Sequence, residues 1–177
     1  MNLKFGLVAA ASLLAVAAFA AIESGLKPGA QPSPFQVVDV TGPNKGKELC
    51  YRCQYGGSPV LAAFVKNDPA KAGQLLTDLQ KVVDARKEKG LKSFAVFMSG
   101  PEAKVAIQKI AAEKKITIPL VFLPQGAQAQ DIASYKISPE ATNTVILWRA
   151  SRVRSNFVDV DTAKVAEVAK AADAMLQ

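Results

Sequence analysis

The chain of 177 residues contains no histidine, only two cysteines and a single tryptophan. The absence of histidine excludes Ser-His and Cys-His catalytic pairs, imidazole-ligated metal sites and a Cys-x-x-Cys-His haem attachment. The sequence also has no glycine-rich phosphate loop, no pair of catalytic carboxylates and no nucleophile elbow, so no cofactor is predicted. The candidate chemistry therefore lies with Cys50 and Cys53.

The first twenty residues have the three parts of a secretory signal peptide. Lys4 gives a basic start, residues 5–20 are almost all apolar, and the run ends in the small-x-small sequence Ala18-Phe19-Ala20. We expect cleavage after Ala20 and an exported protein, either periplasmic or secreted. The run is short for a membrane span of about 20 residues, and no later segment is long and apolar enough to be one. The mature protein is therefore predicted to have no stable membrane span.

Basic residues exceed acidic ones, 22 to 15, and give a net charge of +7. Cleavage after residue 20 would remove only Lys4 from this balance. Most of the basic residues alternate with apolar positions on predicted helices, which is typical of a solvated helix face and not of a nucleic-acid groove. No nucleic-acid partner is predicted, and the sequence indicates no particular oligomeric state.

Apolar strands alternate with amphipathic helices, which predicts one α/β domain over residues 35–177. Residues 21–34 hold three prolines and two glycines and predict a mobile linker. Asp68 and Pro69 are a typical N-cap and first helical residue. Strands are expected at residues 35–40, 59–65, 93–98, 119–123, 144–148 and 155–160. Helices are expected at residues 69–90, from 101 onward, at 128–135 and from 161 onward.

This order of elements resembles the thioredoxin-like superfamily, in the form seen in peroxiredoxins of the alkyl hydroperoxide reductase/thiol-specific antioxidant type and in periplasmic thiol-disulfide reductases. Residues 35–42, FQVVDVTG, are similar to the family's F-x-L-x-D-x-x-G opening. Residues 118–124, IPLVFLP, followed by residues 131–137, DIASYKI, are similar to its P-x-L-x-D…Y-x-V segment. The resemblance implies a three-layer fold with a mixed central sheet and helices on both faces.

The family's own reactive position is without cysteine in this chain. In the family the reactive cysteine follows the second of these strands, at the start of the first long helix, where a thiolate is stabilised. Residues 64–71 read FVKNDPAK at that place. Alignment of the strand at residues 144–147 also puts Thr142 or Asn143 where dithiol oxidoreductases have a cis-proline. The family's peroxidatic mechanism is therefore not expected here.

Cys50 and Cys53 lie upstream of that position, between the first strand and the buried strand at residues 59–65. Two intervening residues let the sulfurs meet in a tight turn, and a disulfide is the expected state in an oxidising compartment. Three roles stay open: a thiol-disulfide redox centre with Arg52 as a thiolate stabiliser, a structural clip in a non-enzymatic binding or scaffold module, and a soft-metal site for copper(I). Another exported thiol or disulfide protein is the partner expected for the redox role.

Overall fold

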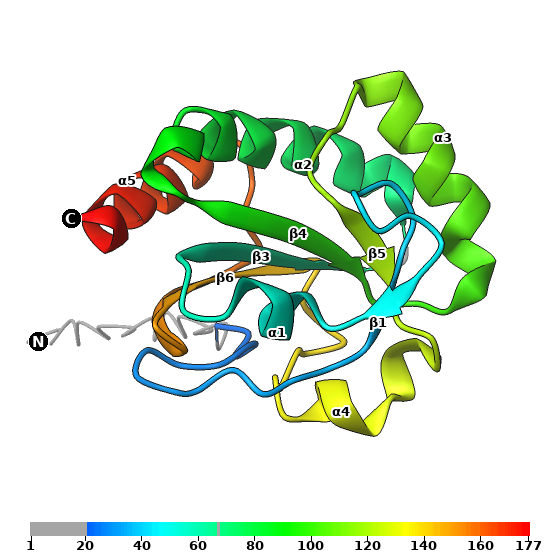
Figure 1. Ribbon diagram of the computed structural model, residues 1–177, viewed down its shortest axis with the longest axis horizontal. Helices are drawn as coiled ribbons and strands as arrows, with labels where there is room; N and C mark the ends of the chain where they lie inside the picture. The colour runs from blue at the N-terminus through cyan, green and yellow to red at the C-terminus, as the bar shows by residue number, and fades with distance from the viewer. Residues whose placement is uncertain (1–20, 67) are drawn as a thin grey trace, which may run out of the picture.

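The computed structural model describes residues 21–66 and 68–177 (Figure 1). The predicted signal peptide, residues 1–20, lies outside the described residues, so its cleavage stays a prediction. None of the helices in the described ranges has the length and apolar character needed to cross a membrane.

A seven-stranded sheet forms the centre of the described part of the chain, in the order β2-β1-β5-β4-β3-β6-β7. β3, β4 and β5 are parallel, whereas β2, β1, β6 and β7 pair antiparallel with their neighbours. The predicted mixed sheet is thus confirmed. The strands are β1 (Val37–Asp39), β2 (Glu48–Leu49), β3 (Val60–Val65), β4 (Lys92–Phe97), β5 (Leu120–Phe122), β6 (Asn143–Arg149) and β7 (Arg152–Val158).

The burial of the central strand β3 explains why its sequence is apolar throughout. All six of its residues are buried, because helices or loops cover both faces of the sheet here. Leu61, Ala63 and Val65 face one core, and Val60, Ala62 and Phe64 face the other. A strand buried on both sides needs apolar residues at consecutive positions, so it does not show the alternation of a half-exposed strand.

Helices cover both faces of the sheet, which confirms the predicted three layers (Figure 1). One face packs against the three longer helices, α2 (Pro69–Asp84), α3 (Lys104–Lys114) and α5 (Val165–Leu176). The other face carries the two short helices, α1 (Tyr51–Tyr55) and α4 (Gln130–Ala133). Three short 3₁₀ turns complete the helical content, η1 (Lys87–Lys89), η2 (Pro101–Ala103) and η3 (Gly126–Gln128).

Helix α2 begins as its sequence predicts. The Asp68 carboxylate accepts a hydrogen bond from the Lys71 N–H at 3.1 Å, and Pro69 is the first helical residue. The helix ends at Asp84, earlier than the expected end at Gly90, because the Arg86 backbone (φ −123°, ψ 9°) leaves the helical region. Gly90 closes the following 3₁₀ turn with φ 83°, the left-handed geometry for which glycine was expected there.

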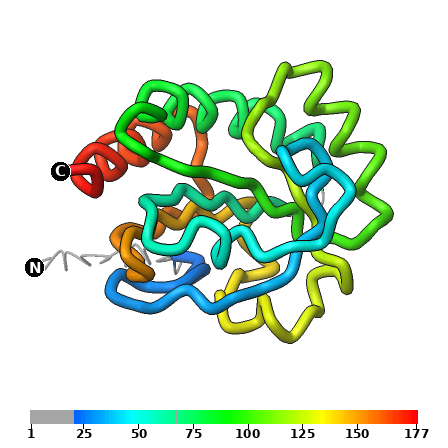
Figure 2. Tube along the Cα trace, in the orientation of Figure 1, coloured from blue at the N-terminus to red at the C-terminus, as the bar shows by residue number. Residues whose placement is uncertain are grey.

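The segment 21–34 is not the mobile linker that its proline and glycine content predicts. The Ser24 hydroxyl lies 2.6 Å from the Thr144 hydroxyl, and the Gly29 N–H donates to the Val153 carbonyl at 2.9 Å. The Tyr135 hydroxyl donates to the Ser33 carbonyl at 2.7 Å. Figure 2 shows this segment in blue, running along the face that also carries α4. These hydrogen bonds give an irregular segment fixed partners, so it packs onto the domain.

An ion pair ties the end of α2 to α5. Arg86 donates through Nε and Nη2 to the two carboxylate oxygens of Asp173, at 2.9 and 2.6 Å. The hydrogen bonds from Arg86 are the main cause that holds the pKa of Asp173 below its usual range. A carboxylate whose pKa is lower in the folded state stabilises the fold above its unfolded pKa of about 3.9, and the stabilisation is lost as the pH falls through the folded value.

We therefore expect Asp173→Asn to be less stable than the wild type at pH 7 and to approach it in stability near pH 2. Urea denaturation at both pH values measures this difference, with the exposed Glu167→Gln on the same helix as the control. A stability deficit in Asp173→Asn that stays constant with pH would contradict the pairing.

Candidate redox site

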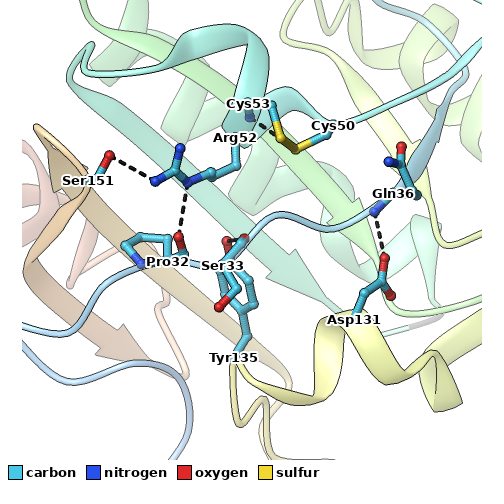
Figure 3. Close-up of a disulfide and its surroundings, with 9 residues drawn as sticks. All are labelled: Pro32, Ser33, Gln36, Cys50, Arg52, Cys53, Asp131, Tyr135 and Ser151. Carbon is cyan, nitrogen blue, oxygen red and sulfur yellow. Dashed lines mark hydrogen bonds between the residues drawn. A yellow bond between two sulfur atoms is a disulfide. The ribbon is translucent and has the colours of Figure 1, made fainter.

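Cys50 and Cys53 form a disulfide on the face of the sheet that carries α1 (Figure 3). Cys50 follows β2 directly and is the N-cap of α1, while Cys53 lies within that helix. The two Cα atoms are 5.2 Å apart, within the normal range for a disulfide. Cys50 is half-buried and Cys53 is exposed. The predicted bond between the two cysteines is confirmed, and it lies at the surface.

The local structure around the pair differs from the simple tight turn that the sequence predicts. Two residues of β2 precede Cys50 and a five-residue helix follows it. Both elements are too short to leave a periodic pattern, which explains why the sequence did not reveal them. The helix ends at Gly56, whose φ of 53° is accessible to glycine at little cost, so Gly56 is the one local signal of this helix end.

One hydrogen bond links the peptide backbone to the disulfide. The N–H of Cys53 donates to the Sγ of Cys50, with 3.0 Å between nitrogen and sulfur. A backbone N–H that points at a sulfur stabilises negative charge there. If the disulfide is reduced, this contact favours a thiolate on Cys50.

Tyr51, between the cysteines in sequence, anchors α1 in the core. Its ring stacks on Phe94 with centroids 5.3 Å apart, and its hydroxyl donates to the Asp39 carboxylate at 2.7 Å. Burial, with the Asp39 hydrogen bond as the next cause, raises the pKa of Tyr51 well above its usual range. The hydroxyl therefore stays protonated near neutral pH and acts as a donor.

Asp39 is almost fully buried at the end of β1, with an exposed fraction of 1%. Besides the Tyr51 hydroxyl it accepts hydrogen bonds from three backbone N–H groups, those of Thr41 (3.1 Å), Gly42 (2.6 Å) and Asn44 (2.8 Å). These donors satisfy the carboxylate without a cation. Asp39 thus joins the loop after β1 to α1, a positioning role that the sequence did not reveal.

Tyr55, one helical turn after Tyr51, is a second packing residue. Its hydroxyl donates to the Ser93 carbonyl at 3.1 Å, and burial raises its pKa to about 12. Its ring lies 5.2 Å from that of Tyr51. The two tyrosines therefore hold the inner side of α1 in the core, while Cys53 stays on its outer side.

Arg52 stands between the two cysteines, and its side chain extends away from the sulfurs (Figure 3). Its Nε donates to the Pro32 carbonyl at 3.0 Å, and its Nη2 donates to the Ser151 hydroxyl at 2.8 Å. These bonds tie α1 to the segment 21–34 and to the turn between β6 and β7. The role of Arg52 in stabilising a thiolate of Cys50 or Cys53 stays a prediction.

A second region of interest lies where β3 ends and α2 begins. Two adjoining cavities of about 690 and 430 Å³ open there, and neither is lined by a cysteine. The Lys66 N–H donates to the Thr142 carbonyl at 3.1 Å, which places Thr142 beside this end of β3. The residues that line both cavities are Val65, Lys66, Asp68, Lys71 and Asn143.

Solved structures share this architecture, although no protein-family model and no curated protein matches the sequence. One is a candidate thiol:disulfide interchange protein, DsbE, from Chlorobium tepidum, with a TM-score of 0.69 at 20% identity over 86% of this chain and 99% of that one. Another is the peroxidoxin BcpB of Mycobacterium tuberculosis, with a TM-score of 0.65 at 15% identity over 85% of this chain and 98% of that one. The chain has a thioredoxin-like fold.

A third structure with the thioredoxin-like fold is a secreted disulfide oxidoreductase of Mycobacterium tuberculosis, homologous to DsbE of E. coli. It aligns with a TM-score of 0.58 at 13% identity, over 79% of this chain and 95% of that one. All three identities are low, so these similarities concern the fold. The function has to be argued from this chain's own residues.

Within the thioredoxin-like fold, the position expected for the reactive cysteine is the start of α2, beside the two cavities. The structure puts the Asp68 N-cap and Pro69 there. Thr142 directly precedes β6, in the place expected for the cis-proline, and no peptide bond of the described residues is cis. The Cys50–Cys53 disulfide precedes β3, whereas the family position follows β3, so the pair is displaced along the chain.

Proposed function

We propose that the protein is an exported thiol-disulfide redox protein whose redox centre is the Cys50–Cys53 disulfide. The observation that carries the proposal is the surface position of the bond, with Cys53 exposed and with a backbone N–H directed at the sulfur of Cys50. Thiol-disulfide exchange requires that an external thiolate can reach one sulfur of the bond and that the thiolate which leaves is stabilised.

The size of the disulfide loop also favours redox exchange over stabilisation of the fold. The two cysteines are only three positions apart, so the bond constrains the unfolded chain little. In the chain-entropy model such a loop stabilises by about 2 kcal/mol, against about 4.7 for a loop of 100 residues. A bond placed chiefly to stabilise the fold would gain more by joining distant segments.

Export is supported by the signal-peptide pattern of residues 1–20 and by the disulfide, since disulfides persist in oxidising compartments. The structural neighbour described as secreted is consistent with this location. In such a compartment the partner would be another exported protein that carries thiols or a disulfide.

The reduction potential of the pair tests the redox proposal. Equilibration of the mature protein with glutathione buffers, read out by alkylation of free thiols, is expected to give a value above about −300 mV, the range of exchangeable disulfides. A value below about −300 mV would overturn the proposal. Cys50→Ser and Cys53→Ser should both lose any reductase activity toward insulin, and Ser58→Ala is the matched control near the same helix.

A structural clip is the second candidate, because α1 is firmly anchored by Tyr51, Arg52 and Tyr55. If the pair is only a clip, a strong reductant should destabilise the protein, whereas glutathione buffers should leave the disulfide intact at equilibrium. Copper(I) binding by the two reduced thiols also stays a prediction. Stoichiometric copper on the reduced wild type and none on Cys53→Ser would support it.

A further inference from the structure

We propose that thiol-disulfide exchange enters through the sulfur of Cys53 and releases Cys50 as the thiolate, so that the mixed disulfide with a partner forms on Cys53. The inference rests on the proposed redox function and deepens it by assigning a role to each cysteine. Two observations point to the same assignment.

The first observation is the difference in exposure between the two sulfur-bearing residues. Cys53 is exposed on the outer side of α1, whereas Cys50 is half-buried where β2 meets the helix. An attacking thiolate must approach the attacked sulfur in line with the bond that breaks, so access selects the attacked atom. Exposure therefore favours attack at Cys53.

The second observation concerns the leaving group. The Cys53 N–H lies 3.0 Å from the Sγ of Cys50, and this contact strengthens as negative charge develops on that sulfur. A better stabilised thiolate leaves faster. Cys50 is therefore favoured as the leaving group, which again places the attack on Cys53.

The exchange with a dithiol partner then runs in two balanced steps. A partner thiolate attacks Sγ of Cys53; the Cys50–Cys53 bond breaks, and its electron pair remains on Cys50. The partner's second thiolate attacks the partner's own sulfur in the mixed disulfide and expels Cys53 as a thiolate. The partner is oxidised to a disulfide and this protein gains two electrons, while protons lost by the partner's thiols can be taken up by the two cysteines. In the reverse direction Cys53 attacks the partner's disulfide and Cys50 resolves the adduct.

Trypsin makes this assignment measurable, because it cleaves after Arg52 and so separates the two cysteines. Cleavage at Lys47, Arg52 and Lys66 puts Cys50 in the peptide 48–52 and Cys53 in the peptide 53–66. The oxidised mature protein is mixed briefly with glutathione, quenched with N-ethylmaleimide and acid, and digested for mass spectrometry. We expect glutathione on 53–66 and maleimide on 48–52, in at least about tenfold excess over the opposite pattern.

The outcomes separate the inference from the function on which it rests. Glutathione mainly on 48–52, or equally on both peptides, would overturn the assignment and leave the redox function standing. Absence of any adduct at millimolar glutathione, together with a reduction potential below about −300 mV, would overturn both.

Single-cysteine variants give a second readout. Each variant keeps one thiol, which attacks an aromatic disulfide reagent and releases thionitrobenzoate. At a pH at which either thiol is ionised, Cys50→Ser, which keeps Cys53, should release it at least about tenfold faster than Cys53→Ser, which keeps Cys50. Faster release by Cys53→Ser would contradict the assignment.

Discussion

Replacement of Asp39 by alanine is expected to lower the free energy of unfolding by about 3–5 kcal/mol. The buried carboxylate accepts four hydrogen bonds, from the Tyr51 hydroxyl and from three backbone N–H groups of the loop after β1. A buried donor left without its acceptor costs about 1–3 kcal/mol. The loop can turn some of its N–H groups to water, so the sum stays below four full penalties.

Urea denaturation followed by circular dichroism measures this loss. Asp39→Asn keeps one acceptor oxygen and should fall between the wild type and the alanine variant. Asp84→Asn removes an exposed carboxylate at the end of α2 and should change little. Wild-type stability in Asp39→Ala would show that the four contacts contribute nothing net.

Replacement of Phe94 by alanine is expected to cost about 3–5 kcal/mol, the usual range for a buried phenylalanine. Phe94 is fully buried in β4, under α1. The loss combines the transfer of the ring with the cavity left behind and with several aromatic contacts. Its ring neighbours are Phe35, Tyr51, Tyr55 and Trp148, at centroid distances of 5.3 to 6.2 Å.

Two matched variants make the Phe94 prediction specific. Phe94→Leu fills part of the space and should cost less than half as much as alanine. Phe157→Ala removes a half-buried ring from the edge strand β7 and should also cost less. Because the Tyr51 ring stacks on Phe94, Phe94→Ala should also weaken the near-ultraviolet circular dichroism signal of the aromatic residues. An unchanged spectrum together with wild-type stability would contradict the role of Phe94 and its ring neighbours.

The fold could be predicted where local sequence and burial agree. The run Val60–Val65 is apolar throughout because β3 is buried on both faces, and α2 starts at its Asp68-Pro69 signal. The disulfide could be predicted from the spacing of Cys50 and Cys53. In each of these cases the physical cause lies within a few residues of the element that it specifies.

Two of the features that could not be predicted depend on distant partners. The segment 21–34 has a linker's composition, yet Ser24 contacts Thr144, 120 positions away. Arg52 lies next to both cysteines in sequence, but its partners Pro32 and Ser151 are 20 and 99 positions away. The Asp39 carboxylate and the N–H directed at Cys50 have partners near in sequence, but the short loop and the five-residue helix that bring these groups together leave no periodic pattern.

The packing of segment 21–34 against late elements has a consequence for the order of folding. The Ser33 carbonyl accepts a hydrogen bond from the Tyr135 hydroxyl, 102 positions later, so this segment is synthesised early but finds its partners only after most of the chain has emerged. Closing such long loops is slow, whereas two cysteines three positions apart meet early. We expect the disulfide to form before the N-terminal segment docks, and pulsed hydrogen exchange during refolding should show the amides of Gly25 and Gly29 among the last to be protected.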